Sequence, residues 1–277
     1  MEDFADDPNA YEEPRPEPAP DIRPYLERLI GWGQAHAPAV ARAAEAVELA
    51  RKRLSHLALF GPGDLVPIAM SIHMRTTGSD RPFVVIDPRR KIDPSCSRSA
   101  ARSLATLGEA MDAARGGTVC IRAIRRPLDW DTASARLADP DEDVRLTVCY
   151  PESRLGDIEL CRPAPVVVAP LAGRDMHRMI DEYSEEAQEA LGMPAPTTAT
   201  QRAWMIGYCH DHNALEAAVR RFLALSCTRG MCEAAYHLGM APVSLSRWMR
   251  RRGLTVQMVT GQADLPSSAP PPPASGP

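Results

Sequence analysis

Five short apolar runs, separated by segments that suit helices, constrain the fold of this chain more than any other feature. The runs occupy residues 56–60, 82–87, 118–124, 144–150 and 164–171. They are continuously apolar rather than alternating, which is typical of parallel strands that are buried on both faces of a sheet. We therefore expect an α/β domain in which a parallel sheet lies between two layers of helices.

The chain changes character after residue 173, where every periodic segment is helical. Apolar residues recur three and four positions apart, which predicts helices at 175–191, 200–209, 213–225, 231–238 and 243–251. The two ends differ from both parts. Residues 1–24 are acidic and rich in proline, and residues 257–277 include four consecutive prolines. Such segments bury too little apolar surface to offset the entropy of ordering, so we expect two disordered tails.

Composition excludes several classes of protein. The chain has 277 residues, a net charge of −4 and 44% hydrophobic residues, which is ordinary for a globular protein. No run of 18 apolar residues occurs, so we expect no membrane-spanning helix, and the acidic start is unlike a secretory signal. Seven scattered cysteines suit a reducing compartment better than a disulfide framework. We therefore expect a cytoplasmic protein.

The segment CEAAYHLGMAPVSLSRWMRRRGL, residues 232–254, contains two short helical patterns joined by a tight turn. Gly239 suits the left-handed residue that ends the first helix, and Pro242 suits the first turn of the second helix. Ala241, which lies between them, is a poor N-cap. The pattern predicts a helix-turn-helix, a motif that places its second helix in the major groove of DNA. We therefore expect double-stranded DNA as a partner.

The second helix of this motif supplies six candidate DNA-binding residues. The first three are expected to reach base edges from within a major groove, and the last three to contact phosphates. In chain order they are Ser244, Ser246, Arg247, Arg250, Arg251 and Arg252. The alternative is a solvated basic helix end that complements the helix dipole. Trp248 is expected to pack against the motif rather than stack on bases.

The order of these pieces from His56 to Leu254 resembles the bacterial enhancer-binding proteins, sigma-54-dependent activators with an AAA+ ATPase domain and a C-terminal Fis-type helix-turn-helix. LALFGPGDLVPIAMSIHMRTTGSDRPFVVID looks like the strand, phosphate loop, helix and second strand that open the ATPase. VVVAPLAGRDMHRMIDEYSEEAQEALG looks like the strand that closes its core and the first lid helix. The resemblance implies a truncated AAA+-like α/β domain over 25–171, an all-α lid over 172–212 and a DNA-binding helix-turn-helix module over 213–256.

The catalytic elements of that family are not matched here. The loop that should cradle phosphates consists of Gly61, Pro62, Gly63 and Asp64. It lacks the lysine that neutralises phosphate charge, which leaves a plain strand-to-helix turn. The two acids that should hold Mg²⁺ and orient water correspond to Arg122 and Ala123, and Leu215 replaces the sensor arginine. We therefore expect no ATPase activity, no other enzyme activity and no bound cofactor.

Two further segments of the family find no match. The arginine-finger segment is missing between Leu155 and Ala164, and nothing like the sigma-54 contact loop occurs between Asp87 and Gly108. The sequence therefore predicts a transcriptional regulator that binds DNA without remodelling sigma-54. One rival interpretation is a non-catalytic scaffold with a vestigial helix-turn-helix, whose tails or AAA+-like domain recruit protein partners. Another is a surviving ATPase with an unusual site.

The resemblance also implies a homodimer or higher homo-oligomer, because Fis-type modules pair through the helix before the motif. That helix is 213–225, and packing within one chain explains its apolar residues equally well; they include Leu215, Val219, Phe222 and Leu223. A group of cysteines and histidines near it has no CxxC pair and no recurrent ligand spacing, so we expect no metal site. Its members are Cys209, His210, His212, Cys227 and Cys232.

Overall fold

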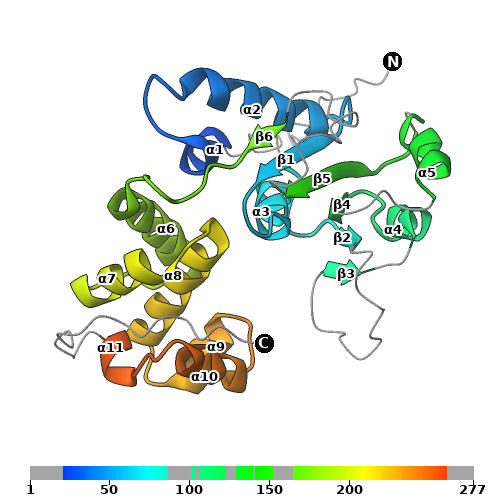
Figure 1. The fold of residues 1–277 in the computed structure, drawn as a ribbon. Coiled ribbons are helices and arrows are strands. Elements are labelled where there is room, and N and C mark those ends of the chain that lie inside the picture. The colour runs from blue at the N-terminus through cyan, green and yellow to red at the C-terminus, as the bar shows by residue number, and fades with distance from the viewer. Residues whose placement is uncertain are drawn as a thin grey trace, which may run out of the picture.

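The computed structural model of the chain describes residues 21–86, 101–103, 106–122, 129–139, 141–151 and 165–260. Within these ranges an α/β part is followed by a part made only of helices (Figure 1). The two expected tails lie mostly outside the described residues. Helices reach slightly into both of them, because α1 (Arg23–Ile30) begins before residue 25 and α11 (Val256–Thr260) continues past residue 256. In the described part of the chain, no helix has the length and apolar character needed to cross a membrane.

In the residues that the structure describes, six strands form one sheet. They are β1 (Leu57–Gly61), β2 (Phe83–Ile86), β3 (Ala101–Ser103), β4 (Thr118–Arg122), β5 (Arg145–Pro151) and β6 (Val166–Val167). Their order across the sheet is β3-β2-β4-β5-β1-β6, and every pairing is parallel. The predicted parallel sheet is therefore confirmed. The sequence does not predict β3, because its three residues at the edge of the sheet carry no apolar run.

Helices cover both faces of the sheet, as predicted. Successive strand residues point to opposite faces, so Leu146 and Val148 of β5 pack with α4 (Leu107–Ala113) and α5 (Trp130–Leu137). Cys149 of the same strand instead joins the core formed with α1, α2 (Ala37–Arg51) and α3 (Val66–Thr76). Because helices cover most of both faces, most strand residues on both sides are apolar, which explains the continuous runs in the sequence.

The carboxyl ends of β1, β4 and β5 meet at one edge of the sheet. Gly61 at the end of β1 pairs with Pro151, and Arg122 at the end of β4 pairs with Cys149. Ligands of open α/β sheets bind outside this edge. The fold therefore places the loop after β1 where a nucleotide would be expected.

Five helices of the second part match the predictions to within a few residues. They are α6 (Met176–Leu191), α7 (Ala199–Tyr208), α8 (His212–Cys227), α9 (Met231–His237) and α10 (Pro242–Arg251). Polar N-caps begin three of them, because side-chain oxygens of Asp175, Thr198 and Asp211 accept bonds from backbone N–H groups of the first turns. The helices extend away from the sheet, and α9, α10 and α11 lie together at the bottom of the view, below α7 and α8 (Figure 1).

A single hydrophobic core, which runs in sequence from Leu171 to Val259, joins these helices. Met205 of α7, Phe222 of α8 and Leu245 of α10 all belong to it. The boundary expected at residue 213 falls inside α8. The residues assigned to the lid and to the DNA-binding module therefore fold around one shared core.

α8 is the helix expected either to pair two chains or to pack within one. Its main apolar residues are at most 1% exposed and lie in the core of their own chain; they are Leu215, Val219, Phe222 and Leu223. Packing within the chain accounts for these residues. Any pairing of two chains must therefore use a different surface.

Because the helices share one core, a destabilising substitution in α7 should also destabilise α10. Met205 is fully buried, so Met205→Ala should lower the free energy of unfolding by about 2–5 kcal/mol, in one transition that includes α10. Denaturant unfolding followed by circular dichroism measures the effect. Ile206→Ala is the control, since Ile206 is 40% exposed, and should cost less than about 1 kcal/mol. Two separate helical transitions, of which Met205→Ala shifts one, would contradict the shared core.

Candidate functional site

The turn between α9 and α10 has the geometry predicted from the sequence. Gly239 adopts a φ of +62°, in the left-handed region, and its N–H donates to the Tyr236 carbonyl over 3.0 Å. Pro242 is the first residue of α10, where its missing N–H costs no helical bond. Ala241 is the N-cap and forms no side-chain cap bond. Both predictions for the turn are confirmed, and packing rather than capping must hold α10 in place.

α10 is fixed by its apolar face. Leu245 is fully buried, and Trp248 and Met249 are 8% and 5% exposed. The Trp248 ring meets Trp204 at 6.0 Å and Phe222 at 5.9 Å between ring centroids, both edge-on, a favourable aromatic geometry. The prediction that Trp248 packs is confirmed. These contacts set the rotation of α10 about its axis and thereby decide which side chains meet solvent.

All six candidate DNA-binding residues are exposed, on α10 or directly after it; they are Ser244, Ser246, Arg247, Arg250, Arg251 and Arg252. Positions 244, 247 and 251 share one side of the helix, because residues three and four apart lie on the same face. Within the described ranges the four arginines form no ion pair. The result is a cationic surface, which we call the arginine face of α10.

One side chain that borders the arginine face is not identified by the sequence analysis. The Arg221 guanidinium of α8 lies over the Trp248 ring, 4.9 Å from its centroid, and Arg252 lies over the same ring at 5.3 Å. Burial, and then the charge of Arg252, lowers the pKa of Arg221. Arg221 belongs to a different helix, so only the packing of α8 against α10 brings it to this surface.

The loop after β1 holds an internal ion pair. Asp64 lies at the start of α3, where one carboxylate oxygen accepts a bond from the Val66 N–H over 3.2 Å. The other oxygen lies 2.6 Å from the Arg122 guanidinium at the end of β4. These two residues stand at the positions that the resemblance assigns to phosphate and metal binding. Ala123 lies outside the described residues. So do residues 155–164, where the arginine-finger segment is expected to be missing, and most of residues 87–108, where no sigma-54 contact loop is expected.

α8 also contacts this loop. The Asn213 amide donates to the Asp64 carbonyl, and a Cβ placed on Gly63 would lie 3.5 Å from the Asp211 side chain. Gly61 has a packing role, because a Cβ there would come within 2.7 Å of the Val168 carbonyl oxygen. Close packing thus explains Gly61 without a phosphate. Two acids beside the loop disfavour a polyphosphate by like-charge repulsion.

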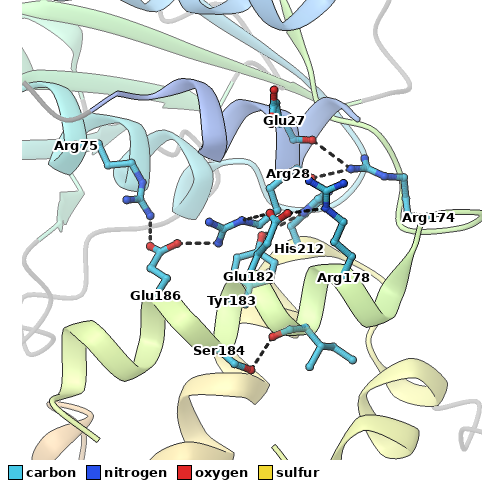
Figure 2. A network of polar contacts seen from close by, with 11 residues as sticks. Glu27, Arg28, Arg75, Arg174, Arg178, Glu182, Tyr183, Ser184, Glu186 and His212 are labelled. Carbon is cyan, nitrogen blue, oxygen red and sulfur yellow. Dashed lines mark hydrogen bonds and ion pairs between the residues drawn. The ribbon is translucent and has the colours of Figure 1, made fainter. Parts of the chain in front are cut away.

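A network of buried charges joins the α/β part to the helical part (Figure 2). The Arg28 side chain of α1 is 8% exposed and lies 2.7 Å from Glu186 and 3.5 Å from Glu182, both on α6. Arg75 of α3 also bonds to Glu186, and the Arg28 guanidinium lies 4.4 Å from the Tyr183 ring centroid. Burial raises the pKa of Glu186, but Arg28 and Arg75 outweigh burial and lower it overall. Glu186 is therefore ionised and balances two arginines across the joint.

His212, the first residue of α8, completes this joint. Its Nε2–H donates to the Ala169 carbonyl over 3.1 Å, and its Nδ1 accepts from the Tyr183 hydroxyl over 3.2 Å. Burial lowers its pKa to about 4, so the ring is neutral. Both nitrogens are engaged, which leaves neither for a metal. Among the described residues, no three histidine, cysteine, aspartate or glutamate side chains gather closely enough to hold one.

No known protein family and no curated protein shows a significant match to this chain. Among solved structures, it is similar to crystal structures of NtrX from Brucella abortus in complex with ATP and with ADP. The identities are 15% and 14%, and the TM-scores are 0.41 and 0.42. Each match covers 83% of this chain and 71% of the other. Similarity of this degree does not extend to activity or ligands, and the α/β fold class rests on the parallel sheet itself.

The neutral His212 predicts that acid destabilises the protein. Its folded pKa of about 4 lies below the ordinary 6.5, so the unfolded chain binds more protons between these values. The free energy of unfolding should therefore fall as pH falls from 6.5 to 4, by up to about 3 kcal/mol from this group. Denaturant titrations at several pH values measure the slope. His212→Gln should flatten it, whereas His210→Gln, at an exposed position, should not. Equal slopes in both variants would refute the assignment.

Proposed function

We propose that this chain is a DNA-binding transcriptional regulator that neither hydrolyses ATP nor contacts sigma-54. The observation that carries the proposal is the arginine face of α10. Its four arginines are exposed and have no ion-pair partner among the described residues, while Leu245, Trp248 and Met249 fix the helix from the other side. A cationic face on the second helix of a helix-turn-helix suits insertion into a DNA groove.

The two halves of α10 have different roles in this proposal. Ser244, Ser246 and Arg247 lie nearer its N-terminal end than the later arginines do and meet base edges, where an arginine can pair with guanine through two bonds. The three later arginines meet phosphates on either side of the groove and release counterions. Affinity therefore depends on salt, and base preference depends mainly on Arg247.

The absence of ATP hydrolysis rests on the charges beside β1. A phosphate loop needs a cation at the loop and acids on the neighbouring strands. Here the loop carries Asp64, and β4, which is separated from β1 by β5, carries Arg122, so the signs are reversed, and the two neutralise each other at 2.6 Å. The α/β part then serves as a platform that positions α10 and meets protein partners. A homodimer or higher oligomer, in the cytoplasm, belongs to the same proposal.

DNA affinity tests the proposed role of α10. It is measured by fluorescence polarisation of the full chain with labelled duplexes at several salt concentrations. Replacing Arg250, Arg251 and Arg252 together by glutamine should weaken binding to every duplex, and reduce the salt slope by about 0.9 per lost phosphate contact. Arg247→Gln should cost about 1–3 kcal/mol and relax sequence preference. Arg42→Gln, at an exposed position on α2, is the control and should change neither.

Two outcomes of that experiment would defeat the proposal. One is a wild-type chain that binds no duplex at about 50 mM salt, where phosphate contacts are strongest. The other is binding that is indifferent to all four arginine replacements. The second outcome favours the scaffold alternative, in which the helix-turn-helix is vestigial.

A separate prediction of the proposal is that the chain does not bind ATP. Isothermal titration of the full chain with ATP and Mg²⁺ should show no binding heat, because Asp64 and Arg122 neutralise each other, which leaves no cation for phosphate and no acid for the metal. Asp64→Ala should not create hydrolysis, since the acids that hold Mg²⁺ and orient water are still lacking. DNA binding by the same samples is the control for folding. Measurable turnover by the wild-type chain would establish the ATPase alternative.

A further inference from the structure

A second polar pocket lies at the opposite edge of the sheet from Asp64. It opens to solvent between α2 and α3, at the amino ends of β1, β4 and β5, and has a volume of about 20 Å³. Its polar lining includes Arg145 and Thr147 of β5, Thr118 of β4, His73 of α3 and Thr77, which follows α3. A space of this size holds one or two water-sized groups, so only the terminal oxygens of a ligand can enter.

Arg145 is an uncompensated cation in this pocket. Its Nε donates to the Arg51 carbonyl over 3.0 Å and its Nη1 to the Gly116 carbonyl over 3.4 Å. Nearby arginines have partners, since Arg51 pairs with Glu48 and Arg53 with Asp143. For Arg145, the described residues supply no carboxylate within ion-pair distance and no bond to Nη2. The backbone bonds hold the guanidinium in place without neutralising it.

The electrostatics of the pocket favour an anion. Burial lowers the pKa of Arg145, the charge of Asp143 opposes this as the largest single charge effect, and the charges of Arg53, Arg51 and Arg81 lower the pKa further. An incoming negative charge would relieve this repulsion between guanidinium groups. The positively charged Arg145 guanidinium is thus partly removed from water, and charge-assisted hydrogen bonds are strong in such an environment.

A hydroxyl group beside Arg145 also lacks a partner. Thr147 is only 5% exposed, and no hydrogen bond of its hydroxyl is found in the part of the chain that the structure describes. The neighbouring His73 is already satisfied, because its Nε2 bonds to the Arg81 carbonyl and its Nδ1 accepts from the Thr118 hydroxyl. The donors left over in the described residues include the Arg145 Nη2 and the Thr147 hydroxyl. The first belongs to the cation itself, and the two together match the oxygens of an anion.

We propose that this pocket binds a phosphate or a phosphoryl group through Arg145 and Thr147. The planar guanidinium of arginine is suited to phosphate oxygens, and the hydroxyl donates a further bond to the same group. Only the terminal oxygens enter, so free phosphate and a phosphate monoester offer the same chemistry to the site. Binding stabilises the folded chain, because the site is assembled from α3 and the starts of two strands and does not exist when the chain is unfolded.

The test is thermal unfolding and isothermal titration of the full chain with sodium phosphate, against sodium chloride at equal ionic strength. For a dissociation constant of about 1 mM, phosphate at about 10 mM should reduce the unfolding equilibrium constant by about tenfold. Arg145→Gln should abolish this effect. Arg42→Gln is the matched control, because it removes an exposed arginine of α2 that does not line the pocket, and should retain the effect.

A second variant tests the hydroxyl and protects the experiment against misfolding of the first. Thr147→Val keeps the side-chain shape and Arg145, and should weaken phosphate binding by about threefold or more. Glycerol 3-phosphate distinguishes the source: tighter binding than phosphate indicates a phosphorylated ligand, and equal binding indicates free phosphate. Equal unfolding in phosphate and chloride, or wild-type phosphate affinity in Arg145→Gln, would overturn the proposal. If Arg145→Gln does not fold, unchanged affinity in Thr147→Val overturns it.

Discussion

The balance of charge around Arg28 decides how the two parts of the molecule dock. This guanidinium is buried where α1 meets α6, and Glu182 and Glu186 neutralise it from the helical part. Arg174 strengthens the same joint by donating to the Arg28 carbonyl over 2.9 Å. A buried ion pair adds little net stability, but removing one partner is costly. The apolar cores therefore supply most of the stability, and the charge network selects one docking among those the apolar surfaces would allow.

This docking ties the arginine face of α10 to the edge of the sheet. α8 begins at the joint, where His212 bonds to Tyr183 and Asn213 bonds to Asp64. Further along, the same helix packs through Phe222 against Trp248 of α10. A loop that binds nucleotide can change its contacts when the nucleotide is hydrolysed. In this structure Arg122 and Asn213 both contact the loop through Asp64, so the loop is linked through α8 to α10.

Features that depend on neighbouring residues of the chain could be predicted from its sequence. Contacts between residues that are distant in the sequence could not. The apolar runs predict strands and the helical periods predict helices, whereas β3 and α11 are too short to show a period. The arginine face was predictable because helical spacing alone separates Arg247 and Arg251 from Leu245. The Asp64–Arg122 pair joins residues 58 positions apart, and only the strand order brings them together. Arg145 and Thr147 share one face of β5 by strand spacing, but the rest of their pocket comes from other helices and strands that only the fold brings together.

The most direct test of the central claim places a photo-reactive amino acid on α10 in the full chain. At position 246, in the exposed first half of α10, the account predicts a covalent crosslink to duplex DNA on irradiation. The same amino acid at position 42, exposed on α2, should give none. A chain that binds duplex DNA but crosslinks from position 42 and not from position 246 would contradict the account, because another surface would then contact the DNA.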